Sequence, residues 1–268
     1  MYWFVTLAIM TYLFTIYLMP KLISMIRPRL TALNYRNQDI PVAVGLVIPL
    51  TSVPFTITAV ILGLVELRAG IVAVITILSF GLLGLIDDTL GSREARGFHG
   101  HLRALVQGQI TTGMLKAGFG GIIALLVAMI NAHGSFVVIL DALIIALCAN
   151  FSNLLDVRPG RAGKFFVLAA AIISICGYGT IPLLLTVVTV IGYLPWDLRC
   201  EVMMGDVGSN VLGALVGLTL TNLTVGLKLL LLLLLVVIHY YAERHSISEV
   251  IERVPVLNYL DQLGRKQV

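Results

Sequence analysis

The sequence predicts an all-α fold, a polytopic transmembrane helical bundle of about nine to ten spans. The chain is 59% hydrophobic and 12% charged, whereas soluble domains are about 45–50% apolar. Its apolar stretches approach the roughly 20 residues that a helix needs to cross a bilayer. Its basic residues collect in alternate loops, as they do in multi-pass membrane proteins.

Nine apolar stretches are long enough to span a membrane, or nearly so. They are Tyr2–Met19, Val42–Val65, Ala69–Ile86, Gly113–Ile130, Phe136–Ala149, Ala162–Ile175, Tyr178–Leu194, Val207–Leu223 and Val225–Ile238. The first stretch has no basic residue before it and no small-residue cleavage site after it, so we expect it to remain as a helix. With nine spans, the two termini lie on opposite sides of the membrane.

The basic residues predict the orientation. Of the 18 Lys and Arg residues, all but Arg68, Lys116 and Lys228 lie in loops that follow odd-numbered spans. The positive-inside rule makes those loops cytoplasmic, with the N-terminus outside and the C-terminus inside a plasma membrane. The same distribution accounts for the net charge of +4, so no nucleic-acid partner is predicted.

The chain divides into a transmembrane domain, residues 1–238, and a cytoplasmic tail, residues 239–268. Ser246 and Glu249 have the spacing of a capping box, and apolar residues follow at helical spacing on both sides of Pro255. We therefore expect one or two amphipathic helices on the membrane surface. A tail packed against the other cytoplasmic loops is the alternative.

Five aspartates lie at the ends of predicted spans, all on the cytoplasmic side: Asp87, Asp88, Asp156, Asp197 and Asp206. Charged groups are costly near lipid, about 2.5–3.5 kcal/mol each at a helix centre. Mg²⁺ binds through one or two carboxylates together with substrate phosphates. The five acids thus predict a metal and phosphate site at the membrane surface, whereas any one of them alone would equally suit a helix end.

Two polar motifs accompany these acids. Asn150, Asn153 and Asp156 recur at a spacing that places them broadly on one helix face, where they could bind a sugar, a uracil edge or a metal-bound water. Capping of the helix end is the alternative. Three cations follow and predict either a phosphate clamp or ordinary positive-inside charge: Arg158, Arg161 and Lys164.

The second polar motif is Met204-Gly205-Asp206-Val207-Gly208-Ser209-Asn210, which opens the eighth span. Gly205 allows the backbone to approach a ligand closely. Asp206 lies at a helix N-terminus, where free N–H groups also attract phosphate.

No zinc site and no disulfide framework are predicted, because neither the three cysteines nor the five histidines show the required spacing. His99 and His101 share a loop with the Asp87–Asp88 pair and are interpreted as surface histidines. Asp141 is an acid in or near the outer end of the fifth span, and we place it at the outer interface.

Three stretches in this order resemble the polyprenyl-phosphate N-acetylhexosamine-1-phosphate transferases, glycosyltransferase family 4: Gly84–Asp88, Asn150–Asp156 and Met204–Ser209. The resemblance covers essentially the whole chain, including Ile40-Pro41 with Gly45. It implies a magnesium-dependent transferase with its active site on the cytoplasmic face. In that reaction a polyprenyl phosphate attacks the β-phosphate of a UDP-sugar, giving lipid-diphosphate-sugar and UMP.

The resemblance also implies residue roles. Residues 1–238 become the catalytic domain, with Asp87, Asp88 and Asp206 as catalytic groups. Asp206 and Asp88 would hold Mg²⁺, or Mn²⁺ in its place. The substrate-binding residues would be Asn150, Asn153, Asp156, Arg158, Arg161, Lys164, Gly205 and Ser209. The partners are then the membrane, a polyprenyl phosphate and a nucleotide sugar, and a homodimer is left open.

The chain departs from the family pattern in three ways. The second Asp-Gly is replaced by Val157-Arg158-Pro159-Gly160, only His239 and His245 stand where the family has a histidine-rich stretch, and the usual tenth span is missing. One alternative is a phosphotransferase that uses another nucleotide-activated donor, with Arg158 and Arg161 replacing the missing acid. A phospholipid transporter or flippase is another, although transporters place polar groups near the midplane. A catalytically inactive scaffold is a third, and the four retained acids argue against it.

Overall fold

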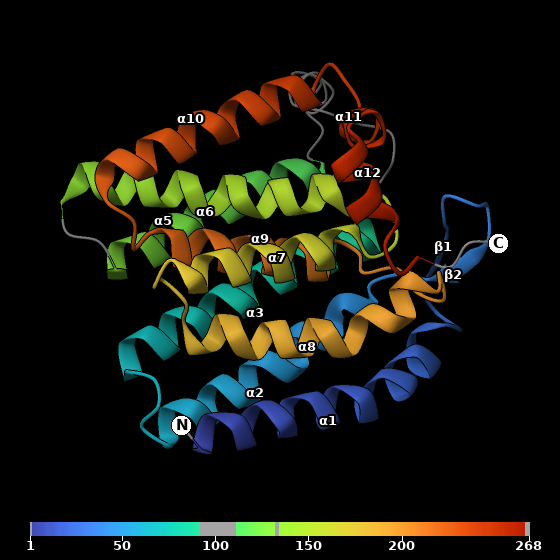
Figure 1. The fold of residues 1–268 in the computed structure, drawn as a ribbon, viewed down its shortest axis with the longest axis horizontal. Helices are drawn as coiled ribbons and strands as arrows, with labels where there is room; N and C mark the ends of the chain where they lie inside the picture. Colours follow the sequence, from blue (N-terminus) through green and yellow to red (C-terminus); the bar gives the residue numbers. More distant parts are fainter. Residues whose placement is uncertain (1, 92–110, 132–133, 266–268) are drawn as a thin grey trace.

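The computed structural model describes residues 2–91, 111–131 and 134–265, and within them nine helices occupy the places of the nine predicted spans (Figure 1). They are α1 (Tyr2–Ile26), α2 (Val47–Ile61), α3 (Leu67–Leu90), α5 (Thr112–Asn131), α6 (Ser135–Leu155), α7 (Arg161–Ile175), α8 (Ile181–Leu198), α9 (Asp206–Leu220) and α10 (Val225–Ala242). Seven helical segments in these ranges are long and apolar enough to cross a membrane, with α2 extended by the 3-10 turn Val44–Leu46. The prediction of an all-α, multi-pass membrane protein is confirmed.

Helix α9 forms the centre of the bundle. Nearly all of its 15 residues are buried, as expected for a helix that is apolar on every side. Its closest neighbours are α3 and α6, and glycines bring their backbones into contact. A Cβ atom on Gly84 of α3 would lie 2.2 Å from the Asp206 carbonyl oxygen, and one on Gly213 would lie 2.1 Å from the Cys148 carbonyl oxygen. Side chains at either position would force the helices apart.

A short β-hairpin follows α1 and was not predicted. Strands β1 (Thr31–Leu33) and β2 (Asp39–Pro41) pair antiparallel, with Thr31 opposite Pro41. Strands of three residues are too short to give an alternating hydrophobic pattern. The hairpin matters because the Pro41 carbonyl accepts a 2.8 Å hydrogen bond from the Met203 N–H, and the Gly45 N–H donates to the Met204 carbonyl at 2.9 Å. These bonds fix the segment that leads into α9.

The tail forms two short helices, α11 (Ile247–Arg253) and α12 (Pro255–Gln262), separated where Pro255 interrupts the chain. The predicted capping-box hydrogen bonds are absent, because the Ser246 side chain makes no capping bond. Glu249 instead pairs with Arg253 at 3.5 Å. The tail also contacts the bundle through a 2.8 Å bond from Arg161 Nε to Asp261 Oδ1, which agrees with the packed alternative.

The opposite end of the bundle holds a second buried ion pair. Lys228 Nζ of α10 lies 2.7 Å from Asp141 Oδ1 of α6, and their side chains are only 6% and 2% exposed. Asp141 is therefore enclosed between two helices and paired with a cation, while its position at the outer interface stays a prediction. The pairing also explains why Lys228 departs from the charge pattern of the loops.

Candidate active site

The turn before α9 places Asp206. Gly205 is the N-cap residue, with φ 73° and ψ 175°, a backbone region that is essentially restricted to glycine. A Cβ atom there would also lie 2.6 Å from Asp88 Oδ2 and 2.9 Å from the Ala43 nitrogen. Gly205 was predicted to let the backbone approach a ligand closely. In the structure, the groups that lie this close to it are Asp88 and Ala43 of the same chain.

Asp88, near the end of α3, caps this turn. Its two carboxylate oxygens accept hydrogen bonds from the backbone N–H groups of Asp206, at 2.9 Å, and Val207, at 3.0 Å. These donors have no partner within the helix, and an anion at a helix N-terminus is favourable. Asp88 therefore orients the backbone that carries Asp206, and its assignment as a metal ligand stays a prediction.

Lys116 of α5 links two of the predicted catalytic acids. Its ammonium donates to Asp206 Oδ2 and lies 3.8 Å from Asp87 Oδ2. From the sequence, Lys116 was predicted only to be an exception to the charge pattern of the loops. A lysine at the start of an apolar span was the signal that could have identified it, because ionisable residues there are usually paired or functional.

Asn153 joins the two polar motifs. Its side-chain nitrogen donates to Asp206 Oδ2 at 3.2 Å, and its side-chain oxygen accepts from Ser209 Oγ at 3.2 Å. Asn153 lies in the last turn of α6, so this contact fixes the end of α6 against the start of α9. We call the group made by Asp87, Asp88, Lys116, Asn153 and Asp206 the acid cluster.

Asp156, the C-cap residue of α6, lies within electrostatic reach of this cluster. Burial raises the pKa of its carboxyl well above the usual range, and the negative charges of Asp197, Asp206 and Asp88 raise it further. A hydrogen bond from the Gly205 N–H acts in the opposite direction. Asp197 has a separate partner, since its Oδ2 accepts from the Gly160 N–H at 3.0 Å.

The remaining predicted site residues lie outside the acid cluster. Asn150 is exposed on α6. Arg158 stacks 4.9 Å from the Tyr35 ring centroid of the hairpin and lies 3.9 Å from Glu252. Arg161 and Lys164 bond to the tail. His99 and His101 lie outside the described residues.

The chemistry of the acid cluster fits a divalent cation held partly by substrate. The Lys116 ammonium already lies between the Asp87 and Asp206 carboxylates, so the position favours positive charge. Among the described residues, no group of three or more His, Cys, Asp or Glu side chains is arranged to hold a metal ion by itself. A cation such as Mg²⁺, which takes few carboxylates and completes its shell with water and phosphate, suits this arrangement.

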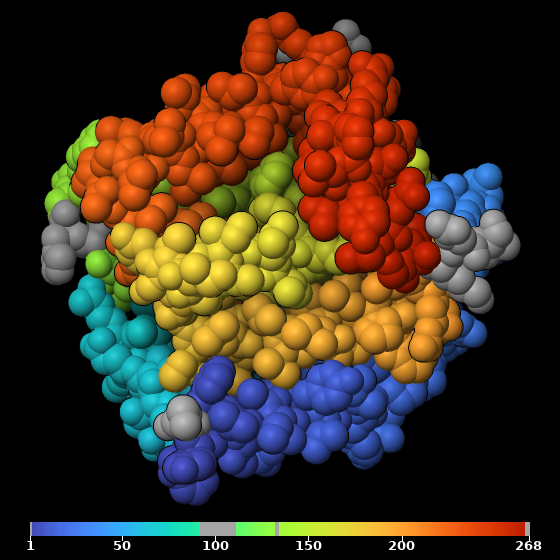
Figure 2. All heavy atoms as spheres, in the orientation of Figure 1, coloured from blue at the N-terminus to red at the C-terminus, as the bar shows by residue number. Residues whose placement is uncertain are grey.

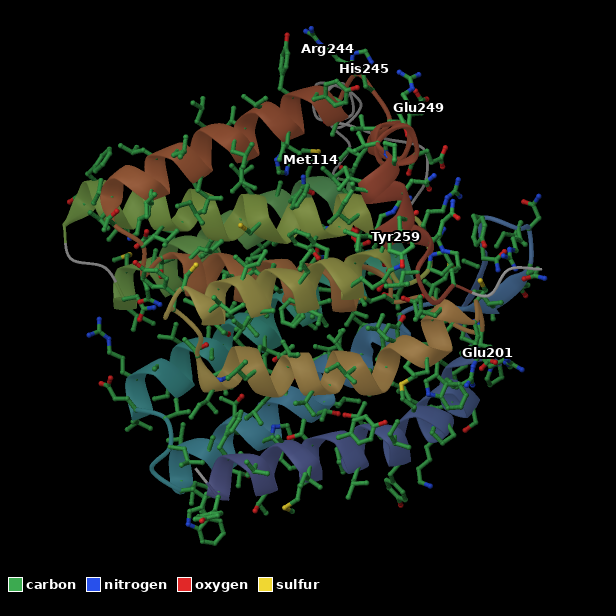
Figure 3. The ribbon with its side chains drawn as sticks, viewed as in Figure 1. Met114, Glu201, Arg244, His245, Glu249 and Tyr259 are labelled. Atoms are coloured by element: carbon green, nitrogen blue, oxygen red, sulfur yellow. The ribbon has the colours of Figure 1, made fainter. Side chains whose placement is uncertain are left out.

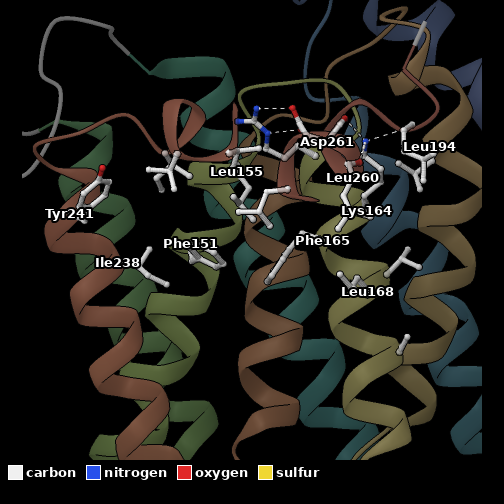
Figure 4. Close-up of a pocket in the computed structure, with 18 of the residues that line it drawn as sticks. Phe151, Leu155, Lys164, Phe165, Leu168, Leu194, Ile238, Tyr241, Leu260 and Asp261 are labelled. Atoms are coloured by element: carbon white, nitrogen blue, oxygen red, sulfur yellow. Dashed lines mark hydrogen bonds and ion pairs between the residues drawn. The ribbon is translucent and has the colours of Figure 1, made fainter. Parts of the chain in front are cut away.

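A large cavity lies on the other side of α6 from the acid cluster. It has a volume of about 910 Å³, and Figure 2 shows a recess between α10 and α7 at this place. In Figure 4, Phe151, Phe165 and Ile238 line it, while Lys164 and Asp261 lie near one end. Its wall is almost entirely apolar, as expected for a site that takes a hydrocarbon chain.

Comparison with known proteins identifies the family. The family model described as glycosyl transferase family 4 matches residues 70–224, which contain most of α3, all of α5 to α9 and every member of the acid cluster. The chain belongs to glycosyl transferase family 4. It is also 28% identical, over 259 residues, to a phospho-N-acetylmuramoyl-pentapeptide-transferase of Kosmotoga olearia, covering 87% of this chain and 78% of that protein. Family and relative together indicate a transferase, which argues against the transporter alternative.

Proposed function

We propose that this protein transfers a sugar-1-phosphate, or a related phospho-sugar, from a UDP-sugar to a polyprenyl phosphate, releasing UMP. The observation that carries the proposal is the position of Asp206. It lies at the N-terminus of α9, where Lys116 and Asn153 converge on its Oδ2. Phosphoryl transfer depends chiefly on positioning and charge neutralisation, and this arrangement can supply both.

Each member of the acid cluster has a proposed task. Asp206 and Asp87 would hold Mg²⁺, which would neutralise charge on the donor diphosphate. Lys116 would keep the two carboxylates together before substrate binds and would contact phosphate when substrate is bound. Asp88 would position the first turn of α9 by accepting hydrogen bonds from its first two N–H groups. Asn153 and Asp156 would contact the nucleotide end.

The cations of the loop after α6 have unequal access to a donor phosphate. Arg158, whose side chain is 33% exposed, remains the candidate for that contact. The apolar cavity beside α6 supports a lipid acceptor. We further propose that the end of the bundle with the acid cluster faces the cytoplasm, where a soluble nucleotide sugar can meet the lipid headgroup.

The direct test is a donor and acceptor panel. Purified protein in lipid nanodiscs receives undecaprenyl phosphate and Mg²⁺ with UDP-N-acetylglucosamine, UDP-N-acetylgalactosamine or UDP-N-acetylmuramoyl-pentapeptide, and nucleotide release is followed. We expect UMP release that requires the lipid phosphate, stops in excess chelator and returns with Mg²⁺. CDP- and GDP-sugars test the alternative of another activated donor. Full turnover in chelator, or no release from any pair, would refute the proposal.

A further inference from the structure

One acid of the tail is held by two arginines. Asp261 Oδ1 accepts from Arg161 Nε at 2.8 Å and from Arg265 at 3.0 Å, while Asp261 Oδ2 accepts from a second Arg161 nitrogen at 3.0 Å. The third Arg161 nitrogen donates to Ser248 Oγ at 2.8 Å. The Arg161 guanidinium thus binds a carboxylate through two parallel hydrogen bonds, the same bidentate geometry with which guanidinium binds phosphate.

A lysine completes the contact from one turn further along α7. Lys164 Nζ donates to the carbonyls of Leu260, Asp261 and Leu263, at 2.9, 2.5 and 3.1 Å. Arg265 also donates to the Pro159 carbonyl at 3.2 Å. Three cations therefore converge on one stretch of the tail that carries a single acid. We call Arg161, Lys164, Arg265 and Asp261 the tail latch.

The tail buries little besides this acid. No residue of α11 is buried, and Asp261 is the only buried residue of α12. Asp261 and Arg161 are 6% and 5% exposed. Most of the apolar side chains of α12 remain open, including Val256 at 68%. The tail is therefore held on the bundle by these electrostatic contacts together with partly buried apolar side chains such as Ile247 and Ile251.

The tail latch lies at the edge of the apolar cavity. Its wall includes Arg161, Lys164 and Asp261 together with Ile247, Ile251 and Leu260 of the tail. Figure 4 shows Lys164, Leu260 and Asp261 close together at one end. An amphiphile with an anionic headgroup and an apolar chain would match both parts of this site. Its headgroup and Asp261 would require the same Arg161 donors.

We propose that Arg161, Lys164 and Arg265 form an anion site in which Asp261 is the resident ligand and the phosphate monoester headgroup of an amphiphile is the exchangeable one, so that α11 and α12 act as a displaceable lid over the cavity. The exchange breaks the Asp261 contacts and forms equivalent contacts to phosphate, with no covalent step. The assignment of this amphiphile to the acceptor rests on the proposed function.

The test is hydrogen–deuterium exchange of the tail amides, residues 247–262, in the full-length protein in nanodiscs. Three probes are compared at equal concentration: dodecyl phosphate, inorganic phosphate and dodecanol. We expect dodecyl phosphate to speed exchange roughly tenfold or more, because it replaces a charge-assisted bidentate pair, while the other two leave it unchanged. Unchanged or slower exchange with dodecyl phosphate would overturn the lid. Equal opening by inorganic phosphate would overturn the assignment to an amphiphile.

Two matched variants separate charge from packing. Asp261→Asn keeps the side-chain volume and should open the tail without any probe. Glu249→Gln removes an exposed acid from the same tail, at the outer edge of the molecule in Figure 3, and should leave the exchange unchanged. If Asp261→Asn lowers the unfolding temperature of the bundle, Arg161→Lys provides the second test, since lysine keeps the charge and lacks the fork. Tail exchange at the wild-type rate in both variants would overturn the proposal.

The lid proposal and the proposed reaction are tested by different measurements, tail exchange and UMP release, so each can be refuted without the other. Opening of the tail by dodecyl phosphate in a protein that releases no UMP would support the lid and count against the transferase proposal. UMP release from a protein whose tail does not open with dodecyl phosphate would support the transferase proposal and overturn the lid.

Discussion

The acid cluster and the tail latch are two groups of charged side chains at the same end of the bundle. They differ in the sign of their net charge and in how deeply their side chains are buried. The acid cluster sets several aspartates against the single lysine, and the side chains of Lys116 and Asp206 are 18% and 21% exposed. In the tail latch three cations face one acid, and the side chains of Arg161 and Asp261 are each 5% exposed. A partly exposed cluster with net negative charge suits a cation and its phosphate ligand, whereas the more deeply buried tail latch holds two parts of the chain together.

The largest expected effect follows from removing the central charge of the acid cluster. Asp206→Asn keeps the volume but removes the negative charge on which Lys116 and Asn153 converge. We expect UMP release to fall roughly a hundredfold or more, with the unfolding temperature nearly unchanged. Asp39→Asn, in the exposed part of the hairpin, is the matched control and should keep full activity. Near-normal turnover of Asp206→Asn would mean that the cluster is not the reaction centre.

A second prediction tests the turn that positions Asp206. Gly205→Ala forces a side chain into a backbone region reserved for glycine and toward Asp88 Oδ2, so it should cost about 1–3 kcal/mol of stability. Activity should fall about tenfold or more, because the Asp88 cap and Asp206 move together. Gly121→Ala, where no atom lies within 4 Å of the added Cβ, should be neutral or slightly stabilising. Equal behaviour of the two variants in thermal unfolding and UMP release would contradict this explanation.

A third prediction is that the Lys116 ammonium and Mg²⁺ compete for the position between the Asp87 and Asp206 carboxylates. Lys116→Gln removes the ammonium that lies between Asp87 and Asp206. We expect half-maximal activity at an Mg²⁺ concentration about fivefold lower, since near a protein surface such a charge contributes on the order of 1 kcal/mol. The maximal rate should fall at the same time. An unchanged Mg²⁺ requirement, measured by titration of UMP release, would show that Lys116 and the metal do not share this position.

The smallest expected effect is a pH dependence of the tail latch. Burial alone would raise the pKa of the Asp261 carboxyl, but hydrogen bonds and positive charge from Arg161, with Arg265, lower it below the usual range. An acid with a lowered pKa stabilises the docked tail above its unfolded pKa of about 3.9, and this stability is lost as pH falls through the folded value.

We therefore expect tail exchange, corrected for its intrinsic pH dependence, to rise several-fold as the pH is lowered from about 5 to 3. The tail also carries Glu249 and Glu252 in α11, so Asp261→Asn is the control. The rise should vanish in that variant. A rise of equal size in Asp261→Asn would assign the effect to the glutamates.

The sequence predicted the bundle well, because the length and hydropathy of a membrane span are local properties. Helix α1 nevertheless continues to Ile26, well beyond the predicted end at Met19. Lys21 lies 4.0 Å over the Tyr17 ring one turn away, so a cation at the membrane edge could be included in the helix. The end of this span was predicted at Met19 because Lys21 is the first charged residue after it.

The site was predicted in part, and the omissions have a common cause. Asp206, Asp88 and Asn153 were found because motifs carry them. The partner of Arg161 is Asp261, 100 residues later, and no local pattern connects the two. Arg161 and Lys164 were interpreted from their residue types as either a phosphate clamp or positive-inside charge, and the structure gives both of them partners in the tail. Long-range pairing depends on how helices pack, which spacing along the chain does not reveal.

The central position of α9 has a consequence for how the chain is made. Its two closest neighbours, α3 and α6, are synthesised before it. Their close glycine contacts with the backbone of α9 can form only once α9 is in place. Until α9 has been synthesised, Asp88 and Asn153 lack their hydrogen-bond partners in that helix. The acid cluster therefore forms late in biogenesis. A chain truncated before α9 would lack the helix on which α3 and α6 pack, and Asp88 and Asn153 would lose the hydrogen bonds that join the cluster.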